Sequence, residues 1–112
     1  MRKITLPYSK SSQLRNEYIP VFFYSDERIN EGVKLTIEAP EFNFIAETVC
    51  SYLISIDQIQ EFMSRNIAGQ SKEEFKETIL KFYEGKVPGI RLSLFHYLLV
   101  KKVTIAQNKS LF

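Results

Sequence analysis

The sequence has few of the residues from which cross-linked, metal-binding or phosphate-binding proteins are built. Its 112 residues include one cysteine, one histidine and four glycines. A single cysteine, Cys50, excludes an internal disulfide and a cysteine-based zinc cage, and is typical of a reducing compartment. There is no GxxxxGK(S/T), HExxH or EF-hand spacing, and so few glycines suit a phosphate-binding loop poorly. We therefore expect no metal ion and no other cofactor.

Long apolar runs are missing as well. No run approaches the ~20 residues that span a bilayer, and the start, MRKITLPYSK, lacks the apolar stretch of a signal peptide. We expect a cytoplasmic protein without membrane contact. With 45% hydrophobic and 25% charged residues, the chain has the composition of one globular domain over residues 1–112. A domain of this length holds a core without a disulfide or metal staple.

The charges are unevenly distributed along the chain, although the net charge is only +2. Residues 1–15 carry +4, residues 16–47 carry −5, residues 48–84 carry −2 and residues 85–112 carry +5. In one interpretation, the basic ends lie beside the acidic middle and neutralise it. In the other, the acidic segment and its tyrosines form a surface for a basic protein partner. The expected partner-binding residues are Tyr24, Asp26, Glu27, Glu31, Glu38, Glu41 and Glu47.

Three strands are expected in the first third of the chain. Residues 2–6 form a short strand that ends at a proline, and residues 18–24 are rich in aromatic and β-branched side chains. Pro20 cannot donate a backbone hydrogen bond, so the second strand is expected at a sheet edge or with its proline at the start. Residues 33–38 alternate strictly between apolar and polar side chains, as a half-buried antiparallel strand requires.

Two later segments are ambiguous between strand and helix. Residues 42–54 fit both periods, but their load of Phe, Ile, Thr, Val and Tyr favours a long, bulged strand. An unbroken strand from residue 90 to 105 would be ~50 Å long, which is too long for this domain. We expect two strands, at 90–97 and 99–106, with a helix over 92–102 as the alternative.

Two amphipathic helices are expected between these segments. Ser55 and Gln58 have capping-box spacing ahead of an apolar stripe that ends at Gly69. Ser71 and Glu74 repeat that spacing before a second helix. The first stripe consists of Ile56, Ile59, Phe62, Met63 and Ile67, and the second of Phe75, Ile79, Phe82 and Tyr83. The predicted fold is α+β: a twisted antiparallel sheet of about five or six strands, with two mid-chain helices packed on one face.

Two other functions are weaker alternatives. A cysteine–histidine enzyme would need Cys50 and His96 within hydrogen-bond reach, and no oxyanion-type loop accompanies either residue. Nucleic-acid or ribosome binding would use the basic ends, but no recognised motif occurs and the bases are few. We expect neither activity. The candidate bases are Lys3, Arg15, Arg91, Lys101 and Lys102.

The order VKLTIEAPEFNFIAETVCSYLISIDQIQEFMSRNIAG, residues 33–69, combines an alternating strand, a Pro-Glu-Phe corner, a β-rich run and a capped helix. It resembles the core of some immunity proteins of bacterial contact-dependent growth inhibition systems. The resemblance implies a stoichiometric inhibitor that binds one cognate toxin domain, commonly a nuclease, and masks its active site. The expected state is a monomer or a weak homodimer.

Overall fold

The computed structural model describes residues 1–13, 15–103 and 107–108. Its helices are α1 (Glu61–Ala68) and α2 (Lys72–Tyr83), and three 3-10 turns are η1 (Ser11–Gln13), η2 (Ile56–Gln58) and η3 (Ile90–Leu92). The strands are β1 (Arg2–Thr5), β2 (Tyr18–Phe23), β3 (Lys34–Glu38), β4 (Phe42–Ser55), β5 (Leu94–Lys102) and β6 (Gln107–Asn108). The α+β class is therefore confirmed.

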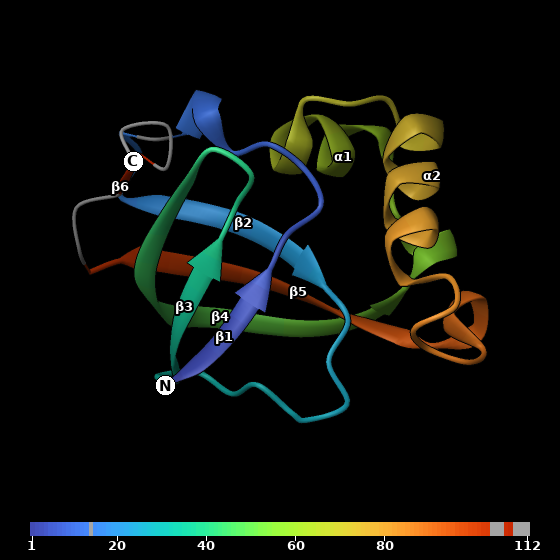
Figure 1. Cartoon of the computed structure of the whole chain (residues 1–112), viewed down its shortest axis with the longest axis horizontal. Coiled ribbons are helices and arrows are strands. Elements are labelled where there is room, and N and C mark those ends of the chain that lie inside the picture. The colour runs from blue at the N-terminus through green and yellow to red at the C-terminus, as the bar shows by residue number, and fades with distance from the viewer. Residues whose placement is uncertain (14, 104–106, 109–112) are drawn as a thin grey trace.

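The strands form a mixed sheet, so the expectation of a purely antiparallel sheet is wrong. The order is β1-β3-β4-β5-β2, and the two-residue strand β6 pairs with β4 (Figure 1). β1 runs parallel to β3, whereas every other pair is antiparallel. The chain passes through β2 on the far edge before it returns as β3, so β1 and β3 point the same way. Side-chain alternation carries no information about strand direction, which is why the sequence did not reveal this pair.

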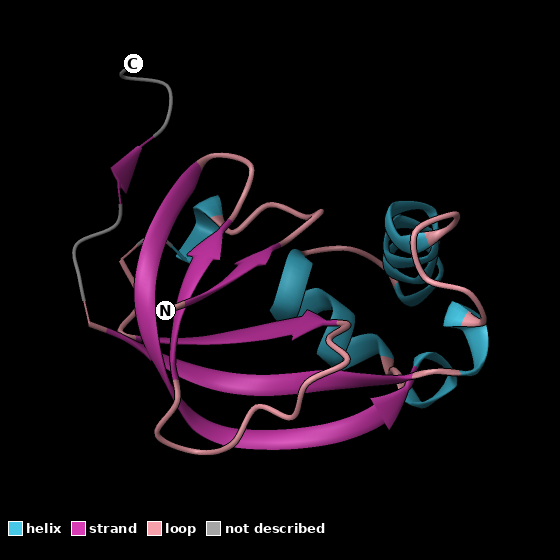
Figure 2. Cartoon of the chain, turned by 60° about the horizontal axis from the view of Figure 1, so that its bottom comes forward, coloured by secondary structure: helices cyan, strands magenta, loops and turns pink. Residues whose placement is uncertain are grey.

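β4 gives the sheet its shape. It is 14 residues long, and its register against β5 shifts between Thr48 and Cys50. Such a bulge bends a strand and increases its twist. Figure 2 shows β4 curving so that β1 and β3 lie across from β2 and β5. The long bulged strand expected at residues 42–54 is confirmed, and the helical alternative is wrong.

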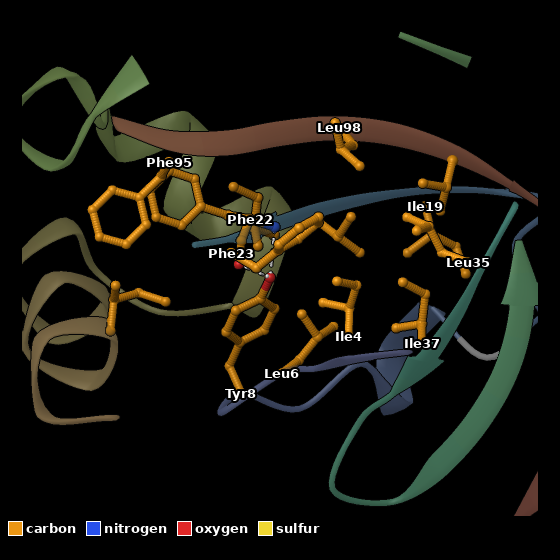
Figure 3. Close-up of a cluster of buried hydrophobic side chains, with 14 of the residues drawn as sticks. Ile4, Leu6, Tyr8, Ile19, Phe22, Phe23, Leu35, Ile37, Phe95 and Leu98 are labelled. Atoms are coloured by element: carbon orange, nitrogen blue, oxygen red, sulfur yellow. Dashed lines mark hydrogen bonds between the residues drawn. The ribbon is translucent and has the colours of Figure 1, made fainter. Parts of the chain in front are cut away.

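The space enclosed by this curved sheet is filled with aliphatic side chains. In Figure 3, Ile4 and Ile37 come from β1 and β3, and Ile19 and Leu98 come from β2 and β5. All four are at most 6% exposed. The opposite face of β2 is covered by helix: Phe22 points to that face, and the ring of Phe75 from α2 meets it edge-on with 5.5 Å between centroids. Packing of the mid-chain helix α2 against one face of the sheet, as expected, is therefore confirmed.

The expectation for the two helices holds for α2 and only in part for α1. The Ser71 side chain accepts the Glu74 N–H at the start of α2, as predicted. The Ser55–Gln58 capping box instead closes the 3-10 turn η2, and α1 begins only at Glu61. This interruption breaks the helical phase of the predicted stripe. Phe62 is therefore 71% exposed, although it was expected in the core.

The last third of the chain differs from both expectations. Residues 94–102 form one strand, β5, rather than two, and residues 90–92 form the 3-10 turn η3. A helix over 92–102 is likewise wrong. Residues 104–106 of the second expected strand lie outside the described residues. Within the described part of the chain, no helix is long and apolar enough to cross a membrane.

β2 is an edge strand, as Pro20 predicted, and side chains close its outer edge. The buried amine of Lys10 donates to the Pro20 carbonyl at 2.7 Å. The Tyr8 hydroxyl donates to the Phe22 carbonyl at 2.8 Å and accepts its N–H at 2.7 Å (Figure 3). Exposed strand edges invite pairing with other chains. These side chains therefore protect β2 from edge-to-edge association.

Candidate protein-binding groove

Two adjoining cavities form a groove between the β2–β3 loop and the paired ends of β4 and β5. Their volumes are about 590 and 410 Å³, and they share Arg28, Leu53 and His96. The groove, as the name is used below, is lined among others by Tyr24, Asp26, Glu27, Arg28, Glu31, Leu53, Leu94 and His96.

The loop wall of the groove is tied firmly to the sheet. Ile29 is buried; its N–H donates to His96 Nε2 at 3.3 Å, and its carbonyl accepts the Ser51 hydroxyl at 2.7 Å. Further along, the Gly32 N–H donates to the Thr48 carbonyl at 2.8 Å. Because these bonds join the loop to β4 and β5, the groove has a fixed wall rather than a free loop on that side.

The floor of the groove presents two exposed leucines. Leu53 is 45% exposed and Leu94 is 52% exposed, and both face the same side of the sheet as His96. The bulge explains their position. Before the bulge, the even-numbered residues Phe44 and Ala46 lie on this face of the sheet. After the bulge, odd-numbered residues of β4 such as Leu53 lie on it instead. Cys50 and Tyr52, which unbroken alternation would place on the face of Phe44 and Ala46, therefore point to the other face.

The rim of the groove is charged. Asp26 and Glu27 both pair with Arg2, at 3.6 Å for Asp26 Oδ1. The Arg28 guanidinium donates to Asn30 at 3.1 Å, and Glu31 is exposed. The rim therefore carries three carboxylates, from Asp26, Glu27 and Glu31. The guanidinium groups of Arg2 and Arg28 offset two of these charges, which leaves the rim with a small negative charge. Much of the charge expected from Asp26 and Glu27 is offset by Arg2.

His96 forms the buried part of the floor. It is 2% exposed, and its ring stacks on Phe23 with 5.4 Å between centroids. Burial lowers the pKa of His96, and the positive charges of Arg2 and Arg28 lower it further. The imidazole is therefore neutral at physiological pH. Its Nδ1 atom is buried and has no hydrogen-bond partner in the part of the chain that the structure describes.

The structure brings together four of the seven predicted partner-binding residues: Tyr24, Asp26, Glu27 and Glu31 line the groove.

The other three lie on the β3–β4 hairpin. Glu38 pairs with Lys3 at 3.6 Å, and Glu41 is half-buried in the turn. Glu47 sits on β4 in register with Lys34 and Lys101.

Sequence reasoning missed Leu53 and Leu94, and it did not place His96 in a binding site. In the sequence Leu94 is one of several apolar residues in the expected strand at 90–97, and nothing in that pattern indicates that it lines a groove.

Cys50 and His96 do not form a catalytic pair. Cys50 lies opposite Leu99 on β5, whereas His96 lies opposite Leu53. Because side chains alternate along a strand, the thiol and the imidazole point to opposite faces of the sheet. No group of three or more potential metal-ligating His, Cys, Asp or Glu side chains occurs among residues 1–13, 15–103 and 107–108.

The basic residues considered for nucleic-acid binding are spread over several elements. Lys3 and Lys101 are already paired with Glu38 and Glu17, at 3.6 and 3.5 Å. Arg91 lies before β5 and Lys101 near its end, so they are separated by roughly 25 Å of strand. The fold therefore does not collect these bases into one patch.

Comparison with protein-family models, with curated proteins and with solved structures gives no match. The function is therefore argued from the chemistry of the groove.

Proposed function

We propose that this chain is a non-enzymatic protein-binding module, an immunity protein that neutralises a cognate bacterial toxin by holding and masking its active domain. The observation that supports this proposal is the groove. Exposed Leu53 and Leu94 lie side by side on its floor, beneath an acidic rim. Water-exposed leucines in a concave site with a charged rim are typical of surfaces that bind proteins.

The partner that fits this groove is a basic protein segment with an apolar anchor. Burying the exposed halves of two leucines would contribute about 2 kcal/mol to the affinity. Glu31, with Asp26 and Glu27, would attract positive charge and speed association, an effect that is screened beyond ~8 Å at physiological ionic strength. In this proposal the predicted residues Glu38, Glu41 and Glu47 form an outer contact on the hairpin.

The wider biological setting follows from the resemblance of residues 33–69 to immunity proteins. The toxin domain would be a nuclease in the commonest case, and the complex would form in the cytoplasm. The inhibitor would act as a monomer or a weak homodimer, in a one-to-one complex.

Co-expression tests this function directly. The probe is the C-terminal domain encoded by the gene immediately upstream, produced under an inducible promoter with and without this protein. We expect growth to be restored only when the protein is present. Continued growth arrest, together with no complex on gel filtration, would refute the proposal.

A charge reversal locates the surface in the same assay. Glu31→Lys changes the exposed acid of the rim, and Glu77→Lys on α2 is the matched control, since Glu77 is exposed and pairs only with Lys81 among the described contacts. We expect Glu31→Lys to slow association, most strongly at low salt, and Glu77→Lys to have no effect. Equal association rates for the two variants would place the binding surface elsewhere.

A further inference from the structure

We infer that the groove receives a carboxylate of the partner on the Arg28 guanidinium, next to the apolar side chain that covers Leu53 and Leu94. The carboxylate is that of an acidic side chain or of a chain end. This inference rests on the proposed function, because it specifies one group of the segment that enters the groove.

Arg28 is the arginine that both cavities of the groove share. Arg2, at the rim, is already engaged, because it pairs with Asp26 and Glu27. Arg28, in contrast, forms no salt bridge with an acid in the described part of the chain. Its hydrogen bond goes to a neutral group, the side-chain oxygen of Asn30 at 3.1 Å. The groove therefore presents a positive charge that none of the described carboxylates contacts.

The contact with Asn30 orients Arg28 and leaves most of its donors available. The bond is made by Nε, which carries one of the five N–H donors of a guanidinium group. The two terminal nitrogens carry the other four, and they have no hydrogen-bond partner among the described residues. Two parallel N–H groups of this kind match the two oxygens of a carboxylate. The next residue, Ile29, is bonded to both β4 and β5, so the base of the arginine is fixed as well.

The floor beside Arg28 is apolar. Leu53 lines both cavities together with Arg28, and Leu94 lines one of them. Both leucines are about half-exposed. An apolar side chain of the partner that covers them brings the polar groups of the same segment close to the guanidinium. A carboxylate carried beside an apolar side chain is therefore held at two points, whereas a free inorganic anion is held at one.

The charges in the groove distinguish a carboxylate from other polar groups. A lysine or arginine of the partner would meet a like charge at Arg28, and a neutral carbonyl would accept weaker hydrogen bonds than a carboxylate. Glu31 lines the larger cavity with Arg28, but the two form no salt bridge with each other. Each charge therefore remains open to a different group of the partner. Glu31 receives a base of the proposed segment, and Arg28 receives its carboxylate.

Titration with two matched pairs of small peptides, followed by NMR of the wild-type protein without the toxin, tests the inference. N-acetyl-leucine carries a chain-end carboxylate, and N-acetyl-leucinamide is its neutral match. N-acetyl-glutamyl-leucinamide carries a side-chain carboxylate, and N-acetyl-glutaminyl-leucinamide is its neutral match. We expect at least one acid to bind roughly threefold to tenfold more tightly than its amide, with shifts of the Arg28 N–H and Leu53 methyl signals. The pair with the larger preference identifies the source of the carboxylate.

Two variants assign the preference to one arginine. Arg28→Met keeps the apolar stem and removes the guanidinium, so it should abolish the preference for the acid over its amide. Arg91→Met is the matched control, because Arg91 is also exposed and forms no ion pair among the described contacts, but lies outside the groove. We expect Arg91→Met to keep the preference. Binding of the toxin domain should weaken roughly threefold to tenfold in Arg28→Met and stay unchanged in Arg91→Met.

Several results would overturn the inference. These are no saturable binding of either acid, equal affinity for acid and amide in both pairs, and a preference that survives in Arg28→Met or is lost equally in Arg91→Met. The wild-type titration needs neither a variant nor the toxin. A protein that prefers the acid yet fails to protect cells therefore rejects the proposed function alone. Normal protection without this preference rejects only the present inference.

Discussion

Lys10 makes the stability of this protein depend on pH in an unusual window. Its side chain is fully buried, and its amine donates to the carbonyls of Pro20 and Ile67, at 2.7 and 2.5 Å. No carboxylate pairs with it among the described contacts. Burial lowers the pKa of Lys10 from 10.5 to about 7. The folded protein therefore holds a lysine that is half neutral at pH 7, whereas the unfolded chain holds a charged one.

The sign of the effect follows from proton counting. Between pH 7 and pH 10.5 the unfolded state binds more protons at this residue than the folded state, so the free energy of unfolding rises with pH. From pH 7 to pH 9 the rise is about 2 kcal/mol. Above about pH 10 the trend reverses, because burial also raises the pKa values of Tyr8 and Tyr83 and only the unfolded chain releases those protons.

Urea unfolding followed by circular dichroism, at steps from pH 6 to pH 11, measures this profile. We expect a maximum between pH 9 and pH 10 for the wild type. Lys10→Met keeps the apolar stem, removes the titrating amine, and should flatten the profile between pH 7 and pH 9. A wild-type profile that is flat or falling in this interval, or a Lys10→Met profile that still rises by the full amount, would refute the reasoning.

Three further predictions concern packing and binding. Phe75→Ala should lower the free energy of unfolding by about 3–5 kcal/mol, because Phe75 is fully buried against Tyr8 and Phe22; Phe62→Ala, at a 71% exposed position on the neighbouring helix, should change it little in the same urea experiment. Tyr8→Phe should cost about 1–3 kcal/mol by leaving the Phe22 N–H and carbonyl unpaired, and an unchanged denaturation midpoint would contradict that role of the hydroxyl. Unrelated single- and double-stranded oligonucleotides should not be retained at ~50 mM salt, whereas retention that weakens steeply with salt would favour nucleic-acid binding through the basic ends.

The elements that sequence predicted well are those fixed by local patterns. The strand at residues 34–38 needs only its own alternation, and α2 needs only its Ser71 cap and the apolar spacing that follows. The Ser55–Gln58 pair shows the limit of such patterns. The same reciprocal hydrogen bonds stabilise a single 3-10 turn, so the pair did not fix where a helix begins.

The features that escaped prediction depend on contacts between distant segments. Lys10 looks like part of a polar loop, and only the fold reveals that its amine links the edge of β2 to the end of α1. The acidic residues of the groove were identified from charge, but its floor was not. Leu53 reaches the floor because the bulge in β4 changes the face on which later residues lie, and a pattern read within one strand does not locate such a shift.

The central claim is that the groove binds the partner protein through Leu53 and Leu94, and isothermal titration with the purified toxin domain tests it most directly. Leu53→Ser combined with Leu94→Ser should raise the dissociation constant about 30-fold. Leu92→Ser, at an even more exposed leucine outside the groove, should leave it unchanged. Equal affinity of the double variant and the wild type, with both folded, would contradict the account.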